Sequence, residues 1–294
     1  MRVSWGTAAI LAFTQSVFGV QSQQAQPPQP ISAGQLVREV VFNELSDHRG
    51  HGYWRYWIER RAPRETRLED RIETADGPIT RLTSTDGHPL SAEGQQQEQA
   101  RLNHLLTSPS EQARHRQEYA EDEARIGRIL ALLPDAFLYE YDGEENGNYR
   151  LSFKPNSDYP PHSIEARIFH GMSGELWVNA RYKRLARLDG HVQENVDFGY
   201  GILGRLNKGG WFQLKRVQVS PEDWKTELLE VHMCGRALLV KSFARDTSEE
   251  RGGFAPVPPS MNLAQGMSLL DQTEAKVQTR AAEAVPGPVA FSLR

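Results

Sequence analysis

The feature that most constrains the fold of this chain is a succession of short segments in which apolar and polar residues alternate. Between residues 136 and 245 these segments follow one another with turn-forming residues between them. Tyr149, Leu151 and Phe153 alternate with polar residues in one such segment, and 164–168 repeat the pattern. A period of two places one set of side chains on each face of a β-strand, and short connections join antiparallel neighbours. The pattern therefore predicts a meander of antiparallel strands.

Residues 53–87 contain a second β region. The stretch 53–61 is rich in aromatic residues, and Asp-Gly pairs at 76–77 and 86–87 indicate turns. Neither alternating βαβ units nor an internal repeat is visible. We therefore expect one α+β domain over residues 31–248, with a large curved antiparallel sheet and helices on one of its faces.

A helix is predicted ahead of the first strands. Ser32 followed by Gln35 forms a capping-box signal, and glycines after residue 49 end the helical pattern. The apolar residues that we expect to face the sheet are Leu36, Val37, Val40, Val41, Phe42 and Leu45.

A helical insertion is predicted at about residues 91–133. Ser108, Pro109 and Glu111 form a strong start signal, and Pro134 should end the helix. The first half of this helix is polar on nearly every face, so only the second half is expected to dock. The polar half is expected either to project or to cover a surface loosely. The apolar residues of the second half are Ile126, Ile129, Leu130 and Leu133.

The first thirty residues resemble a targeting segment and a linker. Residues 1–22 have one positive charge, a mostly apolar run and small residues, which is the layout of a secretory signal peptide. Cleavage is expected after Gly19 or Ser22, with an uncleaved anchor as the alternative. Residues 23–30 are a Gln/Pro-rich linker. We therefore expect a periplasmic or secreted protein with no stable transmembrane anchor after cleavage.

The C-terminal residues 249–294 are rich in glycine, proline and small residues. Such a composition buries little apolar surface. The sequence predicts a mostly disordered tail, with a loose helical stretch around 262–283.

The composition argues against several classes of function. With 34 basic and 38 acidic residues the formal net charge is −4, which is not typical of a nucleic-acid-binding protein. The single cysteine, Cys234, excludes an internal disulfide and a multi-cysteine metal site. The nine histidines lack metal-binding spacing, and no nucleophile–base pair or converging carboxylate pair is visible. We predict no cofactor, no metal and no catalytic residue, with a hydrolase as a third alternative.

One stretch resembles a known superfamily. Residues 174–179 (GELWVN) and 182–190 (YKRLARLDG) form a strand–turn–strand phrase that follows a signal peptide, a helix and aromatic-rich strands. This order is similar to that of the periplasmic superfamily that sorts outer-membrane lipoproteins, the LolA/LolB/RseB-like proteins, and closest to its uncharacterised secreted relatives. The resemblance covers about 135–245 most strongly. It implies an open half-barrel sheet with helices on its concave face, enclosing a hydrophobic cavity for acyl chains.

The expected cavity residues come from the first helix, the first strand and two later strands. Ordinary core packing is the alternative explanation for these side chains. They are Val37, Val41, Trp54, Trp57, Val196, Phe198, Tyr200, Phe212 and Leu214.

Two functions are compatible with these features. The first is a non-enzymatic periplasmic carrier or sensor that binds a lipid, an acyl chain or a lipoprotein in a hydrophobic cavity. The second is an envelope protein–protein interaction module that acts through the helical insertion. The sequence does not identify the ligand or the partner protein.

Overall fold

The protein folds around one large antiparallel sheet. The computed structural model describes residues 31–46, 52–198, 204–237 and 241–272. Thirteen strands form the sheet, which is not closed into a barrel. From one edge to the other, the order is β4 (His88–Pro89), β3 (Ile79–Thr85), β2 (Glu65–Ile72), β1 (Tyr53–Ala62), β13 (Lys241–Val257), β12 (Trp224–Ala237), β11 (Trp211–Gln218), β8 (Leu185–Val192), β7 (Met172–Asn179), β6 (Asn148–Pro155) and β5 (Phe137–Glu145). The short strand β10 (Gly204–Leu206) pairs with β12 and with β9 (Val196–Phe198). The predicted α+β class and large antiparallel sheet are therefore confirmed.

Serine side chains cap four of the helices in the part of the chain that the structure describes, and Ser91 accepts the N–H of Gly94 at one of these starts. The helices are α1 (Ala33–Ser46), α2 (Ala92–Thr107), α3 (Pro109–Ala136), α4 (Ile164–His170) and a further helix over 263–272. Ser32 and Ser108 accept the expected backbone N–H groups at the starts of α1 and α3. Ser163 does the same for α4, where its Oγ accepts the N–H of Ala166. The strand predicted at 164–168 was wrong, because this cap begins a helix there instead.

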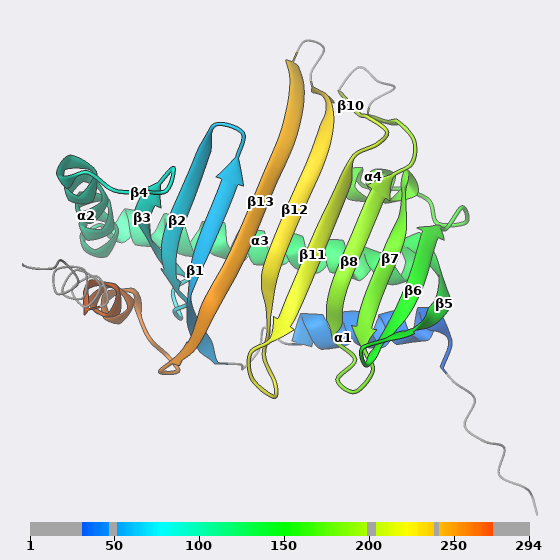
Figure 1. Ribbon diagram of the computed structural model, residues 1–294, viewed down its shortest axis with the longest axis horizontal. Coiled ribbons are helices and arrows are strands. Elements are labelled where there is room, and N and C mark those ends of the chain that lie inside the picture. Colours follow the sequence, from blue (N-terminus) through cyan, green and yellow to red (C-terminus); the bar gives the residue numbers. More distant parts are fainter. Residues whose placement is uncertain (1–30, 47–51, 199–203, 238–240, 273–294) are drawn as a thin grey trace, which may run out of the picture. The chain divides into compact units, whose positions relative to one another are not determined.

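The strand order makes helix α3 cross the sheet. Strands β4 and β5 lie at opposite edges, although only α2 and α3 separate them in the chain. The eleven strands of the order have ten gaps of about 4.8 Å, so the edges are about 48 Å apart. Helix α3 has 28 residues and is about 42 Å long. One helix therefore spans nearly the whole width of the sheet (Figure 1).

Helix α2 covers the exposed edge of β3. The Oε1 atom of Glu98 accepts the backbone N–H of Leu82 at 2.9 Å, and Arg101 donates to the backbone carbonyl of Thr80 at 2.6 Å. An uncovered edge strand would offer these groups to another chain. The first part of the insertion therefore has a structural role at this edge.

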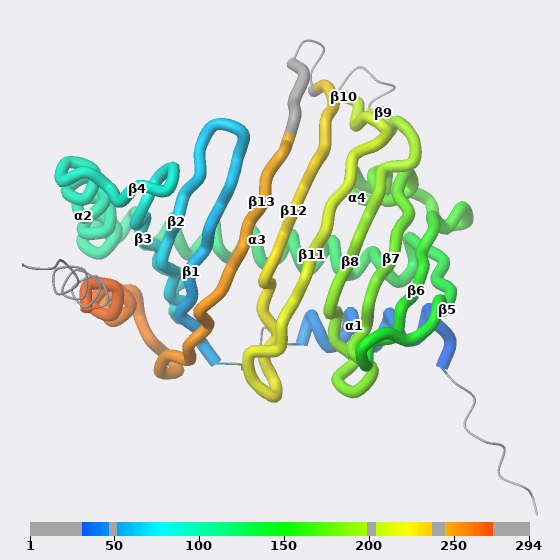
Figure 2. The backbone as a smooth tube through the Cα atoms, in the orientation of Figure 1, coloured from blue at the N-terminus to red at the C-terminus, as the bar shows by residue number. Residues whose placement is uncertain are grey.

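The C-terminal segment packs on the face of β2 and β3 that is opposite to α3. Tyr56 of β1 lies near Tyr119 of α3, so its side chain is on the α3 face of the sheet. Arg71 of β2 is its cross-strand partner and shares that face. Ile72 is the next residue along β2 and therefore lies on the opposite face. Helix 263–272 follows β13 (Figure 2), and a Cβ atom at its Gly266 would lie 2.9 Å from Ile79 and 3.7 Å from Ile72, which places the helix on the side of these residues. The buried cluster there consists of Ile72, Ile79, Leu102, Met261, Leu263, Met267 and Leu270.

The structure moves the predicted end of the domain. Strand β13 runs to Val257, past the expected boundary at residue 248, and residues 261–270 contribute to a buried cluster. The tail prediction overlooked that Met261, Leu263, Met267 and Leu270 have a partner surface elsewhere in the chain. The segments 1–30 and 273–294, which include the predicted signal peptide and linker, lie outside the described residues.

Replacing Leu270 tests this packing. Leu270 is 1% exposed, so Leu270→Ala should lower the free energy of unfolding by about 2–3 kcal/mol, near the lower end for buried leucines. The low value is expected because a helix near the chain end can shift into the space. Urea denaturation would measure the change. Gln272→Ala, at an exposed position of the same helix, is the control, and equal stability of both variants would contradict the packing.

Candidate functional site

A row of leucines forms the floor of the candidate site. Leu151, Leu176, Leu188, Leu214 and Leu229 are direct cross-strand partners on β6, β7, β8, β11 and β12. Direct partners share one face of a sheet, so this row is continuous over five strands. Leu151 is 0% exposed, whereas the last three leucines are half-buried. The floor is therefore closed near β6 and more open towards β12.

A second row next to the leucines is built from glycine and phenylalanine. Gly174 lies opposite Gly190, and Phe153 and Phe212 are their outer partners on β6 and β11. A Cβ atom at Gly190 would overlap the Phe212 ring, and one at Gly174 would lie 2.8 Å from Cζ of Phe153. The two glycines therefore leave the space into which both rings lie.

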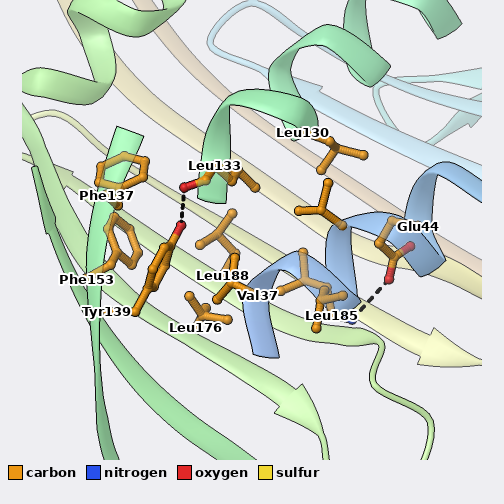
Figure 3. Close-up of a pocket in the computed structure, with 12 residues that line it drawn as sticks. Val37, Glu44, Leu130, Leu133, Phe137, Tyr139, Phe153, Leu176, Leu185 and Leu188 are labelled. Atoms are coloured by element: carbon orange, nitrogen blue, oxygen red, sulfur yellow. Dashed lines mark hydrogen bonds between the residues drawn. The ribbon is translucent and has the colours of Figure 1, made fainter. Parts of the chain in front are cut away.

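Helices α1 and α3 close a narrow apolar slot over this floor. Figure 3 shows the side chains that line it. Its volume is about 30 Å³. Ligand pockets usually enclose about 300–1,000 Å³, so the slot in this structure is too small for an acyl chain. The lining residues are Val37, Val40, Val41, Glu44, Leu130, Leu133, Phe137, Tyr139, Phe153, Leu176, Leu185 and Leu188.

Aromatic side chains form one end of the slot. Phe137 packs edge-on against Phe153, with ring centroids 4.7 Å apart, and contacts Phe169 of α4 at 5.1 Å. The hydroxyl of Tyr139 donates to the carbonyl of Leu133 at 2.7 Å. Burial raises the pKa of Tyr139 far above its ordinary value, so its hydroxyl stays protonated. This end is therefore apolar and uncharged.

A buried charge cluster forms the other end. Glu44, in the last turn of α1, is 4% exposed. Arg184 donates Nε and Nη2 to its two carboxylate oxygens, each at 3.1 Å, and the N–H of Leu185 donates to Oε1 at 3.0 Å. Arg216 donates Nη1 to Oε2 of Glu44 and Nη2 to the carbonyl of Trp224. This network joins α1 to β8 and β11.

The polar half of α3 docks on the turn between β2 and β3. A Cβ at Gly77 would lie 3.1 Å from Nε2 of His115 and 3.3 Å from Tyr119, and Arg116 pairs with Asp76 at 3.6 Å. Burial raises the pKa of the Tyr119 hydroxyl to about 12. Of the two expected alternatives for the polar half, a loose cover of a surface therefore agrees with these contacts, whereas a free projection does not.

Burial lowers the pKa of His115 below 6.5, and nearby Arg71 acts in the same direction, whereas Glu118 and the backbone at Gly77 and Pro78 oppose it. The unfolded chain then binds the proton first as the pH falls through 6.5. We expect stability to decrease from pH 7.5 to 5.5 through this group.

His115→Gln should reduce this loss of stability when urea denaturation is compared at the two pH values. The carboxylates with lowered pKa, such as Glu98 and Glu249, act below about pH 4.5 and contribute little in this window. An identical pH dependence in both proteins would contradict the prediction.

The structure brings together part of the predicted site. Val37 and Val41 line the slot, and Leu214 and Phe212 extend its floor on β11. Phe42, which was expected to face the sheet, is 70% exposed and lies on the outer side of α1.

Trp54 and Trp57 do not share a site. Trp54 belongs to a separate buried cluster with Tyr56 and Ile58, and Trp57 lies on the opposite face over Gly252. The two tryptophans are three residues apart on β1, and an odd spacing along a strand places two side chains on opposite faces.

The strand β9 residues also lie away from the slot. Val196 is buried beside Gly171, and half-buried Phe198 is not among the slot residues. Tyr200 lies outside the described residues. Glu44 and Leu188 line the slot but were not among the expected site residues, because the cross-strand register that brings the strands under α1 is not visible in a single sequence.

Comparison with known protein families found no matching family, and comparison with curated proteins found no similar sequence. Among the described residues, no group of three or more His, Cys, Asp or Glu side chains could hold a metal ion. Within the same part of the chain, no helix is long and apolar enough to cross a membrane.

Proposed function

We propose that this protein is a non-enzymatic carrier or sensor that binds the acyl chain of a lipid or lipoprotein between the sheet and helices α1 and α3. The slot supports this proposal most directly. Only Glu44 and Tyr139 among its twelve lining residues have a polar side chain, and the Tyr139 hydroxyl is already bonded to Leu133. Such a lining offers dispersion contacts and burial from water, as an acyl chain requires.

Helix α3 is the element that we expect to move. Ala136 is its only buried residue among 28, and its slot residues Leu130 and Leu133 are half-buried. Exposing these two half-buried leucines costs less than the ~3–6 kcal/mol of two fully buried ones, because a fully buried leucine contributes about 1.5–3 kcal/mol. A chain of about ten carbons gains about 8 kcal/mol on burial before the costs of association. The gain from chains of ten or more carbons is therefore large enough to offset the exposure of Leu130 and Leu133.

The half-barrel form of the sheet, the relationship to the lipoprotein-sorting superfamily and the periplasmic or secreted location belong to the same proposal. The helix, sheet and helical insertion in this order are compatible with them. N-terminal sequencing of the protein recovered from the envelope or medium would test export: a start at residue 20 or 23 is expected, and an intact residue 1 would contradict cleavage.

Native mass spectrometry tests the proposed binding. Protein purified from its envelope should carry lipid, and the delipidated protein should take up dodecanol or dodecanoate. Leu188→Trp fills the slot and should weaken uptake at least tenfold. Leu138→Trp, at a position 46% exposed on β5, is the matched control and should bind normally. An apo mass with no uptake of either probe would contradict the proposal.

An interaction module is the second candidate. A polar hollow of about 430 Å³ lies where α2 meets α3, with Arg101, His104, Glu111, Arg114 and Glu118 among its lining residues. Deleting the insertion is unsuitable as a test because α2 covers the edge of β3. Arg114→Glu keeps the fold, since this side chain is 65% exposed. Loss of a co-purifying envelope protein with unchanged lipid uptake would favour this candidate.

A further inference from the structure

We propose that the bound chain carries an anionic head, a carboxylate or a phosphate, which lies at the Glu44 end of the slot against Arg216. This inference rests on the proposed function and names its ligand class. The slot runs along α1 from Val37 to Glu44, about 10 Å at 1.5 Å per residue. Its aromatic end has no charged lining residue, and its other end is the charge cluster. An amphiphile therefore has one orientation that suits both ends.

Hydrogen-bond capacity decides the charge of the head. A carboxylate has about four acceptor positions, and Glu44 receives four donors, two from Arg184, one from Leu185 and one from Arg216. It therefore has no capacity for a hydroxyl or ammonium head. Arg216 has five N–H donors, of which Glu44 and the Trp224 carbonyl use two. The unused capacity at this end consists of donors, which an anion accepts.

The position of Arg216 makes this capacity reachable. Its side chain is 15% exposed, whereas that of Glu44 is 5% exposed. Arg216 bonds to Glu44 of α1, so it lies on the slot face of the sheet. It contacts the last turn of α1, beyond which α1 no longer covers the floor. A head placed there has partial contact with water, which reduces the cost of removing the anion from solvent.

Isothermal titration of the full mature chain with twelve-carbon probes tests the inference. Dodecanoate at pH 8 should bind at least tenfold more tightly than dodecanol, and dodecyltrimethylammonium should bind most weakly. Arg216→Gln should remove the preference for dodecanoate over dodecanol. Arg187→Gln is the matched control: this arginine lies on the outer face beside Trp177, and its loss should change neither affinity. Lauroyl lysophosphatidylglycerol, compared with dodecanoate, distinguishes a lipid head from a free acid.

Equal affinity of the wild-type protein for dodecanoate and dodecanol would overturn the inference while leaving the proposed function intact. Failure of both probes to bind would instead contradict the proposed function. Because Arg216→Gln removes a partner of buried Glu44, Arg216→Lys provides a second variant that keeps the charge. It should retain part of the preference for dodecanoate. If neither variant folds, the comparison of probes in the wild-type protein still decides the result.

Discussion

Glu44→Gln is expected to lower the free energy of unfolding by about 3–5 kcal/mol, one of the two largest effects of a single substitution in this protein. The side chain is 5% exposed and holds Arg184 and Arg216. Removing one partner of a buried ion cluster leaves the other charges without compensation. Glu39→Gln, on the same helix but half-exposed, should change stability by less than about 0.5 kcal/mol. Urea denaturation at pH 7 measures both variants.

A second comparison separates lost compensation from lost packing. Replacing Glu44 by Leu together with Arg184 and Arg216 by Met removes all three charges and keeps the volume filled. Such exchanges are often neutral or stabilising. We expect the triple variant to recover at least half of the loss seen for Glu44→Gln. If the triple variant were less stable than Glu44→Gln, the three charged side chains would stabilise the fold by more than neutralising one another.

Gly174→Ala should destabilise the protein by about 3 kcal/mol or more. A Cβ at this position would overlap the backbone carbonyl oxygen of Asp189 on β8 and lie 2.8 Å from the Phe153 ring. Overpacking usually costs about 1–3 kcal/mol, and the upper end applies because backbone atoms cannot turn away as a side chain does. Thermal and urea denaturation would show the loss. A change below 1 kcal/mol would contradict the close approach of β7 and β8 at Gly174.

Gly190→Ala is the matched control, because it introduces an overlap with a side chain and not with the backbone. Its Cβ would overlap only the ring of Phe212 among its three nearest atoms. In a Phe212→Ala background, Gly190→Ala should therefore cost less than about 0.5 kcal/mol, whereas Gly174→Ala should keep its full effect. This double-mutant cycle measures the coupling between the glycine and the ring. Equal costs of Gly190→Ala in both backgrounds would exclude that coupling.

Local sequence signals predicted the elements that depend on neighbouring residues. The caps at Ser32 and Ser108 bind backbone N–H groups three residues later, and the alternation at Leu151 and Phe153 reflects a strand with one buried face. The same local reasoning failed after Ser163, because apolar residues at 164, 166 and 168 are compatible with a strand as well as with a short capped helix. Local signals therefore suffice when they are long or accompanied by a clear cap.

The candidate site was only partly accessible to such reasoning. Val37 and Val41 were found because a helix face can be read from spacing. Glu44 was not, because its partners Arg184 and Arg216 are more than 130 residues away and reach it only through the strand order. Trp57 was assigned to the wrong face because a single sequence does not show which side of a strand receives the helices.

The sequence by itself determined the α+β class, the large antiparallel sheet, the capped helices and the apolar character of α1, because these follow from periodicity and local hydrogen bonding. Only the tertiary structure decided that β4 and β5 lie at opposite edges, which turns α3 into a helix across the sheet. It also decided that residues 261–270 are buried and that a charge cluster ends the slot. These features depend on strand order and register, in which residues distant in the chain become direct neighbours.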